Sequence, residues 1–193
     1  AAFLEDQDFF RFFGIFRNVT LKALPDAHME DVWFQPVLNQ DNSSGKVSVI
    51  MKVTAPEKQN VDARFVLTDR EGTVITEKCL QLQGRDGIFT GTIHTDVQNI
   101  KLWDNHSPYL YHACVELIEE NGVMLEVVPY DIGFRRLEVI DKVIYLNGKR
   151  LVITGVNRHE WNPKTGRCIG MQEMTADIDC MLRNNINAVR TCH

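Results

Sequence analysis

The stretch "LVITGVNRHEWNP", Leu151–Pro163, places an apolar run directly before a group of polar side chains and a proline. The polar residues are Asn157, Arg158, His159 and Glu160. Such a group at the end of a strand is either a polar loop with local ion pairs or the rim of a site at the carboxyl end of a sheet strand. The sequence that follows favours the second interpretation.

The chain around this stretch predicts a strand–helix–strand unit. The segment "IYLNGKRLVITGVN" has a hairpin pattern with Asn147-Gly148 at its turn, and Leu151–Ile153 is predicted to be an apolar strand. A helix of about ten to twelve residues is expected in "MQEMTADIDCMLRNN", followed by a strand in "INAVRTCH". The apolar positions of this helix are Met174, Ile178, Met181 and Leu182. Because one such unit demands a larger parallel sheet, we expect the chain to be a piece of a larger protein.

Candidate functional side chains follow both predicted strands of this unit. His159 comes just after the first strand, and Arg190 and His193 lie at the end of the second. Parallel strands end at the same edge of a sheet, so we expect the two histidines to converge there. The remaining histidines lie in a predicted sandwich strand or on polar turns and strand surfaces, where structural or solvated roles are expected.

Upstream of this unit, the sequence reads as short strands separated by turns. Roughly seven strands without an amphipathic helix are typical of an immunoglobulin-like β-sandwich, and Asn121-Gly122 supplies a strong hairpin signal. The clearest strands are Lys46–Val53, Asp62–Asp69, Thr73–Leu82 and Ile88–Val97. We therefore expect a mainly β fold, with a sandwich followed by an incomplete β/α segment.

The first nineteen residues differ from the sandwich in composition. Ala1–Val19 is acidic at first and then strongly aromatic, so it is expected to pack on something and reads as the tail of a preceding domain. Its aspartates Asp6 and Asp8 are either a solvated acidic run, which the spacing favours, or oxygen ligands for a cation or a sugar.

Composition excludes several classes of partner. A net charge of -5 and a pI near 5.7 give no electrostatic footprint for nucleic acid or an anionic membrane surface. Neither a membrane span nor a signal peptide is recognisable, and a cytoplasmic location fits. The 5 cysteines lack a C-x-x-C pair, which predicts free thiols and argues against a metal site. Nucleotide-loop, serine-hydrolase and zinc-hydrolase motifs do not occur.

Three blocks of the sequence, taken in order, resemble one enzyme family. They are "LEDQDFFRFFGIFRNV", then "IKLWDNHSPYLYHACVEL" with "IGFRRLEV", then "LNGKRLVITGVNRHEWNPKTGR" with "NNINAVRTCH". Together they are similar to the β-galactosidases of glycoside hydrolase family 2, and the similarity covers essentially the whole chain. The first and last blocks favour β-galactosidases over the glucuronidases and mannosidases of the same family.

The resemblance implies a domain organisation. Residues 1–19 would be the tail of an amino-terminal jelly-roll domain that binds sugar, residues 20–138 the immunoglobulin-like sandwich, and residues 139–193 the start of a TIM barrel. The parent protein would hydrolyse terminal β-galactosides such as lactose with retention of configuration, and is expected to be a homo-oligomer. Its two catalytic glutamates would lie downstream, so the chain alone is expected to be inactive.

The resemblance also implies roles for individual residues. Asp8 would contact the galactosyl group and a sodium ion, while His159 and His193 would contact sugar hydroxyls. Arg190 would orient the nucleophilic carboxylate. Magnesium ligands would lie downstream, and Glu160 matches a position outside the catalytic pair. Cys192 stands where a serine is common in the family.

Two alternatives stay open at this point. One is a non-catalytic immunoglobulin-like module that serves as a spacer or binds carbohydrate. The other is a parent of the same family that prefers another sugar. A downstream reading frame with Asn-Glu at a barrel strand end would favour the enzyme, and rates on different nitrophenyl glycosides would identify the sugar.

Overall fold

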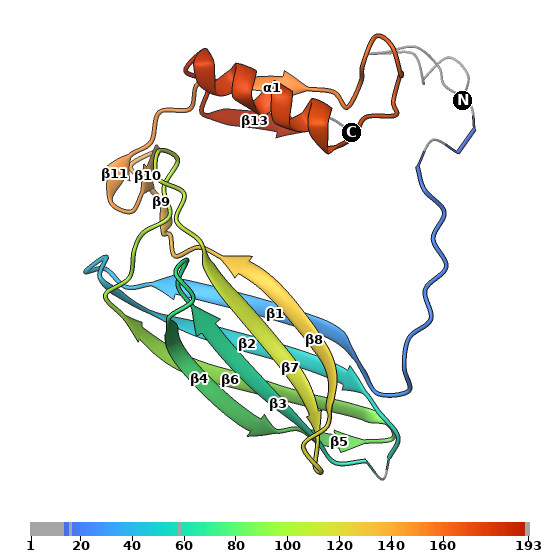
Figure 1. Cartoon of the computed structure of the whole chain (residues 1–193). Coiled ribbons are helices and arrows are strands. Elements are labelled where there is room, and N and C mark those ends of the chain that lie inside the picture. Colours follow the sequence, from blue (N-terminus) through green and yellow to red (C-terminus); the bar gives the residue numbers. More distant parts are fainter. Residues whose placement is uncertain (1–13, 16, 58, 192–193) are drawn as a thin grey trace. The chain divides into compact units, whose positions relative to one another are not determined.

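A computed structural model describes residues 14, 15, 17–57 and 59–191 (Figure 1). By its contacts the chain divides into two compact units. One unit is Ala23–Leu151, and the other takes in Ala1–Lys22 and Val152–His193. Asp8 and His193, two of the predicted site residues, lie outside the part that the structure describes.

The unit Ala23–Leu151 contains the predicted β-sandwich. One sheet has the strand order β1-β2-β6-β5 and the other β4-β3-β7-β8, and every neighbouring pair is antiparallel. This confirms the immunoglobulin-like prediction, with β4 added beside the three strands β3, β7 and β8. The bounds are β1 His28–Leu38, β2 Ser44–Thr54, β3 Val61–Thr68, β4 Val74–Gln81, β5 Gln83–Arg85, β6 Ile88–Gln98, β7 Tyr111–Glu119 and β8 Met124–Ile132.

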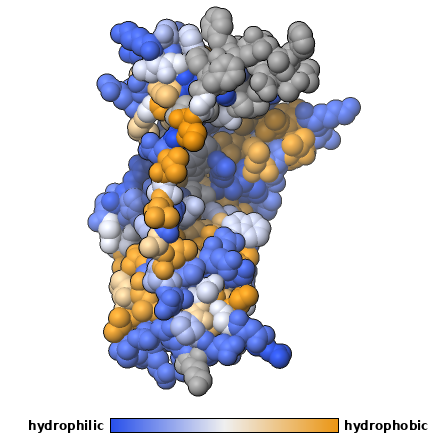
Figure 2. Space-filling model, turned by 90° about the vertical axis from the view of Figure 1, so that its right-hand side faces the viewer, coloured by the Kyte–Doolittle hydropathy of each residue, from blue (hydrophilic) through white to orange (hydrophobic). Residues whose placement is uncertain are grey.

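The sandwich core follows from strict alternation along the central strands. In β3 and β7 every second side chain is buried between the sheets, while their neighbours remain partly exposed. Fully buried side chains of this core include Phe65, Leu67, Met51, Val49 and Leu117. On the face shown in Figure 2, hydrophilic side chains lie between the hydrophobic ones.

Each sheet edge carries a feature that hinders pairing with another strand. The edge strands β1 and β8 contain Pro36 and Pro129, which lack a backbone N–H. In β4, Lys78 pairs with the buried Phe65, so this exposed cation lies on the core-facing side of the edge. Strand β5 has only 3 residues.

A tyrosine fixes the start of β7. The hydroxyl of Tyr111 accepts a hydrogen bond from the backbone N–H of Lys101 at 2.8 Å, and its ring meets Phe134 edge-on at 5.4 Å between centroids. Burial raises the pKa of this phenol. A buried tyrosine bonded to the backbone upstream is the corner motif of immunoglobulin-like sandwiches.

A small hairpin sheet, with strand order β11-β10-β9, follows the sandwich. Its strands are β9 Leu137–Ile140, β10 Val143–Leu146 and β11 Lys149–Arg150. The predicted turn is confirmed, because Asn147 and Gly148 have φ values of 52° and 79°. Asn147 is buried, its Oδ1 accepts from the Arg136 N–H at 2.8 Å, and its Nδ2 donates to the Trp103 carbonyl at 3.0 Å. Contacts group this hairpin with the sandwich, while the predicted domain division after residue 138 stays a prediction.

The second unit contains the predicted parallel strand–helix–strand path. Strand β12 is Gly155–Arg158, helix α1 is Met171–Arg183 and strand β13 is Ala188–Thr191. Strands β12 and β13 pair in parallel, as predicted. No helix in the described part of the chain is long and apolar enough to cross a membrane.

The predicted strand at Leu151–Ile153 is wrong, because the strand begins at Gly155. Val152 and Ile153 are exposed, and the side chain of Asn187 occupies the backbone groups around them. Its Nδ2 donates to the Val152 carbonyl at 2.8 Å, and its Oδ1 accepts from the Thr154 N–H at 2.8 Å. An amide side chain, rather than a neighbouring strand, therefore satisfies this part of the backbone.

Candidate functional site

The carboxyl ends of β12 and β13 form the candidate site. Asn157 pairs with Arg190, and Arg158 pairs with Thr191, so the two parallel strands end side by side at this edge of the sheet. His159 is the first residue after β12. The structure thus places His159 and Arg190 at the same end of one parallel pair, whereas the expected convergence of His159 with His193 stays a prediction.

Arg158 shows which face of this pair the helix covers. Its Nε donates to Asp177 Oδ2 at 2.8 Å, and its Nη2 lies 2.8 Å from the same oxygen. Asp177 belongs to α1, so Arg158 points to the face that α1 covers. Successive side chains of a strand point to opposite faces, so Asn157 and its partner Arg190 lie on the face away from the helix. Both of these residues are exposed there.

The loop after β12 is held by its own hydrogen bonds. Asn162 and Gly166 exchange two backbone hydrogen bonds of 2.8 Å, and the N–H of Trp161 donates to the His159 carbonyl at 3.0 Å. Gly166 has a φ of 63°, which a glycine adopts without strain. His159 is half-buried, so its imidazole is positioned by a structured loop.

Glu160 belongs to a long-range ion pair. Its carboxylate contacts the guanidinium of Arg17, within the same compact unit. Arg17 lies 143 residues earlier in the sequence, so this contact is long-range, and the expectation that Glu160 lies outside the catalytic pair stays a prediction. The candidate site therefore combines an imidazole, a guanidinium and an amide, without a pair of carboxylates among the residues that the structure describes.

These residue types suit the binding of a polyhydroxylated ligand. An imidazole can donate and accept hydrogen bonds, and a guanidinium binds carboxylates in a fixed geometry. Nothing in the described ranges groups three His, Cys, Asp or Glu side chains that could hold a metal ion. The predicted sodium ligand Asp8 lies outside those ranges.

Sequence reasoning missed Asp177 and Asn187, which hold β12 at its two ends. Asp177 carried a detectable signal, because it lies three residues after Met174 and one before Ile178, inside the apolar stripe of the helix. An acidic residue in that position predicts a cationic partner on the surface that the helix covers.

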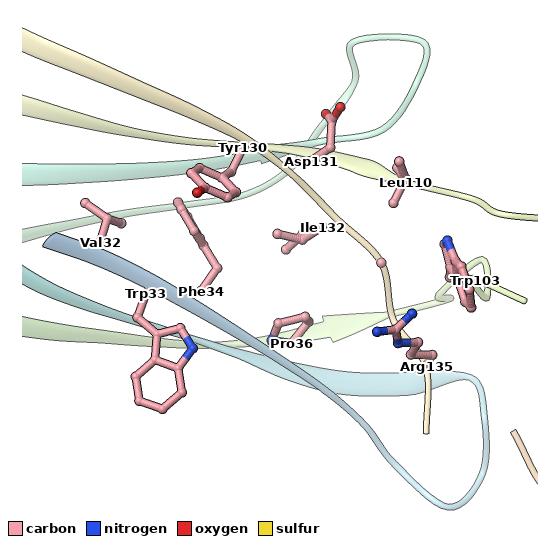
Figure 3. Close-up of a pocket in the computed structure, with 11 residues that line it drawn as sticks. Val32, Trp33, Phe34, Pro36, Trp103, Leu110, Tyr130, Asp131, Ile132 and Arg135 are labelled. Atoms are coloured by element: carbon pink, nitrogen blue, oxygen red, sulfur yellow. The ribbon is translucent and has the colours of Figure 1, made fainter. Parts of the chain in front are cut away.

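A groove lies on the sandwich, between β1 and β8 (Figure 3). It has a volume of about 570 Å³. The indole of Trp33 and the ring of Tyr130 are both more than half exposed, at 59% and 57%. The guanidinium of Arg135 lies over the Trp103 ring, 4.6 Å from its centroid, while the Asp131 carboxylate contacts His112 Nδ1 at 2.6 Å. This groove shares no residue with the site at β12, which belongs to the other unit.

Comparison with protein families gives two matches along the chain. The model described as glycosyl hydrolases family 2 matches residues 27–135. The model described as glycosyl hydrolases family 2, TIM barrel domain, matches residues 137–193. The two matches meet between β8 and β9.

Curated relatives match the whole chain. A "Beta-galactosidase large subunit" from Lactobacillus acidophilus is 46% identical over 194 residues, and one from Leuconostoc lactis is 47% identical over 195 residues. Each alignment covers 100% of this chain and 30% of the relative. The chain therefore spans less than a third of the length of these relatives.

Solved structures share the fold. A β-glucuronidase from Bacteroides uniformis has a TM-score of 0.79 at 24% identity, over 92% of this chain and 22% of that one. A β-glucuronidase from Parabacteroides merdae has a TM-score of 0.78 at 23% identity, over 88% of this chain and 21% of that one. At this level of identity the similarity establishes the fold alone.

Proposed function

We propose, from the premise that this chain belongs to glycosyl hydrolases family 2, that it is a segment of a retaining β-galactosidase. The observation that carries the proposal is identity of 46% and 47% to two β-galactosidase large subunits across the entire chain. The sandwich would serve as scaffold and the strand–helix–strand unit as the start of the catalytic barrel. The barrel edge at β12 and β13 would then be part of the sugar site.

The chain would contribute binding and orientation rather than the acid and the nucleophile. His159 and His193 would bond sugar hydroxyls, and Asp8 would contact the galactosyl group. Arg190 would hold the nucleophilic carboxylate, because a guanidinium fixes a carboxylate by two parallel hydrogen bonds. Retaining hydrolysis needs two carboxylates about 5 Å apart, which we expect on later barrel strands.

Several finer expectations belong to the same proposal. Lactose is the proposed substrate, and the parent protein is proposed to be a cytoplasmic homo-oligomer that acts in carbohydrate metabolism. Sodium at Asp8 and magnesium near the catalytic glutamates are the proposed metal ions. Assays after dialysis against a sodium-free potassium buffer that contains a chelator, with each ion then restored singly, measure which of the two the activity needs.

The activity is tested on the complete protein that contains this chain. Nitrophenyl β-galactoside should be hydrolysed faster than the corresponding β-glucuronide and β-mannoside. His159→Ala should lower kcat/KM by about 100-fold, because a misplaced sugar ring loses its alignment with the carboxylates. Glu160→Gln is the matched control and should retain activity near that of the wild type. Preferred hydrolysis of the glucuronide or mannoside would refute the proposed substrate.

A second candidate function is supported by the groove between β1 and β8. Exposed aromatic rings beside charged hydrogen-bonding groups suit a sugar ring, which has an apolar face and hydroxyl edges. The chain would in that case be a carbohydrate-binding module. Trp33 and Trp103 line the groove, whereas Trp161 lies in the other unit.

The 3 tryptophans make this candidate function easy to test in the 193-residue chain. Lactose is titrated while the three indole N–H signals are followed by NMR. Movement of the Trp33 and Trp103 signals alone would favour the module. Movement of the Trp161 signal alone would instead point to the edge at β12, and three unchanged signals would eliminate the module.

A further inference from the structure

An ion pair joins the end of β12 to the helix. Arg158 is the last residue of the strand, and Asp177 lies near the middle of α1. Two nitrogens of the guanidinium reach the same carboxylate oxygen at 2.8 Å. Only 14% of the Arg158 side chain is exposed, whereas 48% of the Asp177 side chain is, so the guanidinium is largely buried while solvent reaches the carboxylate.

The start of β12 has a different attachment. Besides the two bonds from its side-chain amide, Asn187 donates its backbone N–H to the Thr154 carbonyl at 2.9 Å. Three hydrogen bonds from one residue therefore fix the chain before the strand begins. Loss of the ion pair would remove the side-chain link between the carboxyl end of β12 and α1, and would leave that end held by its backbone pairing with β13.

The ion pair fixes how the strand end is rotated about its own axis. Because neighbouring side chains alternate between faces, holding Arg158 on the helix face holds Asn157 on the other face, beside Arg190. The same constraint sets the direction in which the chain leaves the strand at His159. A guanidinium suits this task because its rigid, planar group fixes an angle as well as a distance.

We propose that Arg158 and Asp177 form a positioning pair that aligns His159 and Asn157 with Arg190 for sugar binding. Neither member of the pair would touch the substrate. The proposal rests on the proposed function for the identity of the ligand, but its structural part can be measured without any activity.

The structural part is tested by hydrogen exchange in the 193-residue chain. Asp177→Asn should speed exchange of the Trp161 and Asn162 amides by about tenfold, because the strand end from which the loop starts loses its ion pair with α1. Arg158→Lys keeps the charge without the planar fork and should give a smaller increase. Exchange in the sandwich strands serves as the internal control and should not change.

The functional part is tested in the complete protein with nitrophenyl β-galactoside. Asp177→Asn should lower kcat/KM by about tenfold or more at an unchanged melting temperature. Asp177→Glu keeps the carboxylate and should recover part of the loss, which a general loss of stability would not allow. The exchanged pair, Arg158→Asp with Asp177→Arg, should recover more activity than either single change.

The outcomes separate the two proposals. Unchanged loop exchange in Asp177→Asn overturns the positioning pair, and so does faster exchange with wild-type kcat/KM. A complete wild-type protein that hydrolyses no galactoside refutes the proposed function instead, while the exchange result still decides whether the ion pair anchors the loop.

Discussion

The sandwich and the strand–helix–strand unit both have regularly spaced apolar residues, yet only the sandwich buries most of these side chains. Among the described residues, every buried side chain of the hydrophobic core lies between Ala27 and Leu146, apart from Ile169. In α1 no residue is buried, and Ile178 and Leu182 are exposed by 51% and 61%. A regular spacing of apolar residues predicts that a strand or helix forms. Burial of its apolar face requires a second layer of structure to cover that face.

The difference has its origin in how the two kinds of sheet are completed. Antiparallel sheets close on one another within a continuous stretch, so Ala23–Leu151 supplies both layers of its own core. Parallel sheets are covered on both faces and need many strands and helices. One parallel pair with one helix therefore leaves most of its apolar surface exposed, as seen at Val189.

The largest predicted effect is the difference in stability between an alanine substitution in the sandwich core and one in α1. Phe65→Ala should lower the free energy of unfolding by about 3–5 kcal/mol, because it opens a cavity at a fully buried position. Ile178→Ala in α1 should change it by about 0.5 kcal/mol or less. Urea denaturation of the 193-residue chain, followed by circular dichroism, measures both. Similar losses for the two variants would mean that the helix is packed as tightly as the sandwich.

A second, smaller effect is predicted for the two Asn-Gly turns. Asn147→Ala should cost about 1–3 kcal/mol, since it leaves the Arg136 N–H and the Trp103 carbonyl without their partner. Asn121→Ala is the matched control, because Asn121 precedes a glycine in an equivalent sequence but is exposed. Thermal unfolding of both variants compares them. Equal melting temperatures would show that Asn147 does not hold the hairpin to the sandwich.

Much of the sandwich could be predicted from its sequence. The strand predicted at Ile88–Val97 is observed at Ile88–Gln98, and that predicted at Asp62–Asp69 is observed at Val61–Thr68. Alternation, β-branched residues and glycine-containing turns are local signals, so the sequence around each strand is sufficient to locate it.

Long-range side-chain contacts were not predictable in the same way. The apolar residues Leu151–Ile153 indicate a strand. The side chain of Asn187, more than thirty residues away, instead forms hydrogen bonds with the backbone at Val152 and Thr154. The pairing of Arg158 with Asp177 likewise depends on how α1 lies on β12. Local periodicity predicts on which face of a strand or helix each of these residues lies, but it does not predict which residue it contacts.

The smallest predicted effect concerns the stability of the sandwich in acid. Both oxygens of Asp41 accept hydrogen bonds from Ser43 and Ser44, two from backbone N–H groups and two from hydroxyls. These bonds, led by that from the Ser43 N–H, lower the pKa of Asp41 to about 2 from 3.8. Because the folded state holds this carboxylate ionised, its contribution is complete above pH 4 and is lost as the pH falls toward 2.

The substitution Asp41→Asn removes this titration from the sandwich. The melting temperature of the wild type should exceed that of Asp41→Asn near pH 5, and the difference should shrink steadily as the pH is lowered to 2. Asp86→Asn, at an exposed turn of the same sandwich, is the matched control. A difference between wild type and Asp41→Asn that stays constant with pH would show that hydrogen bonding to the ionised carboxylate does not stabilise this loop. The acid sensitivity would then have to come from other carboxylates, such as Asp69 and Asp104, whose pKa values are also lowered by backbone N–H groups.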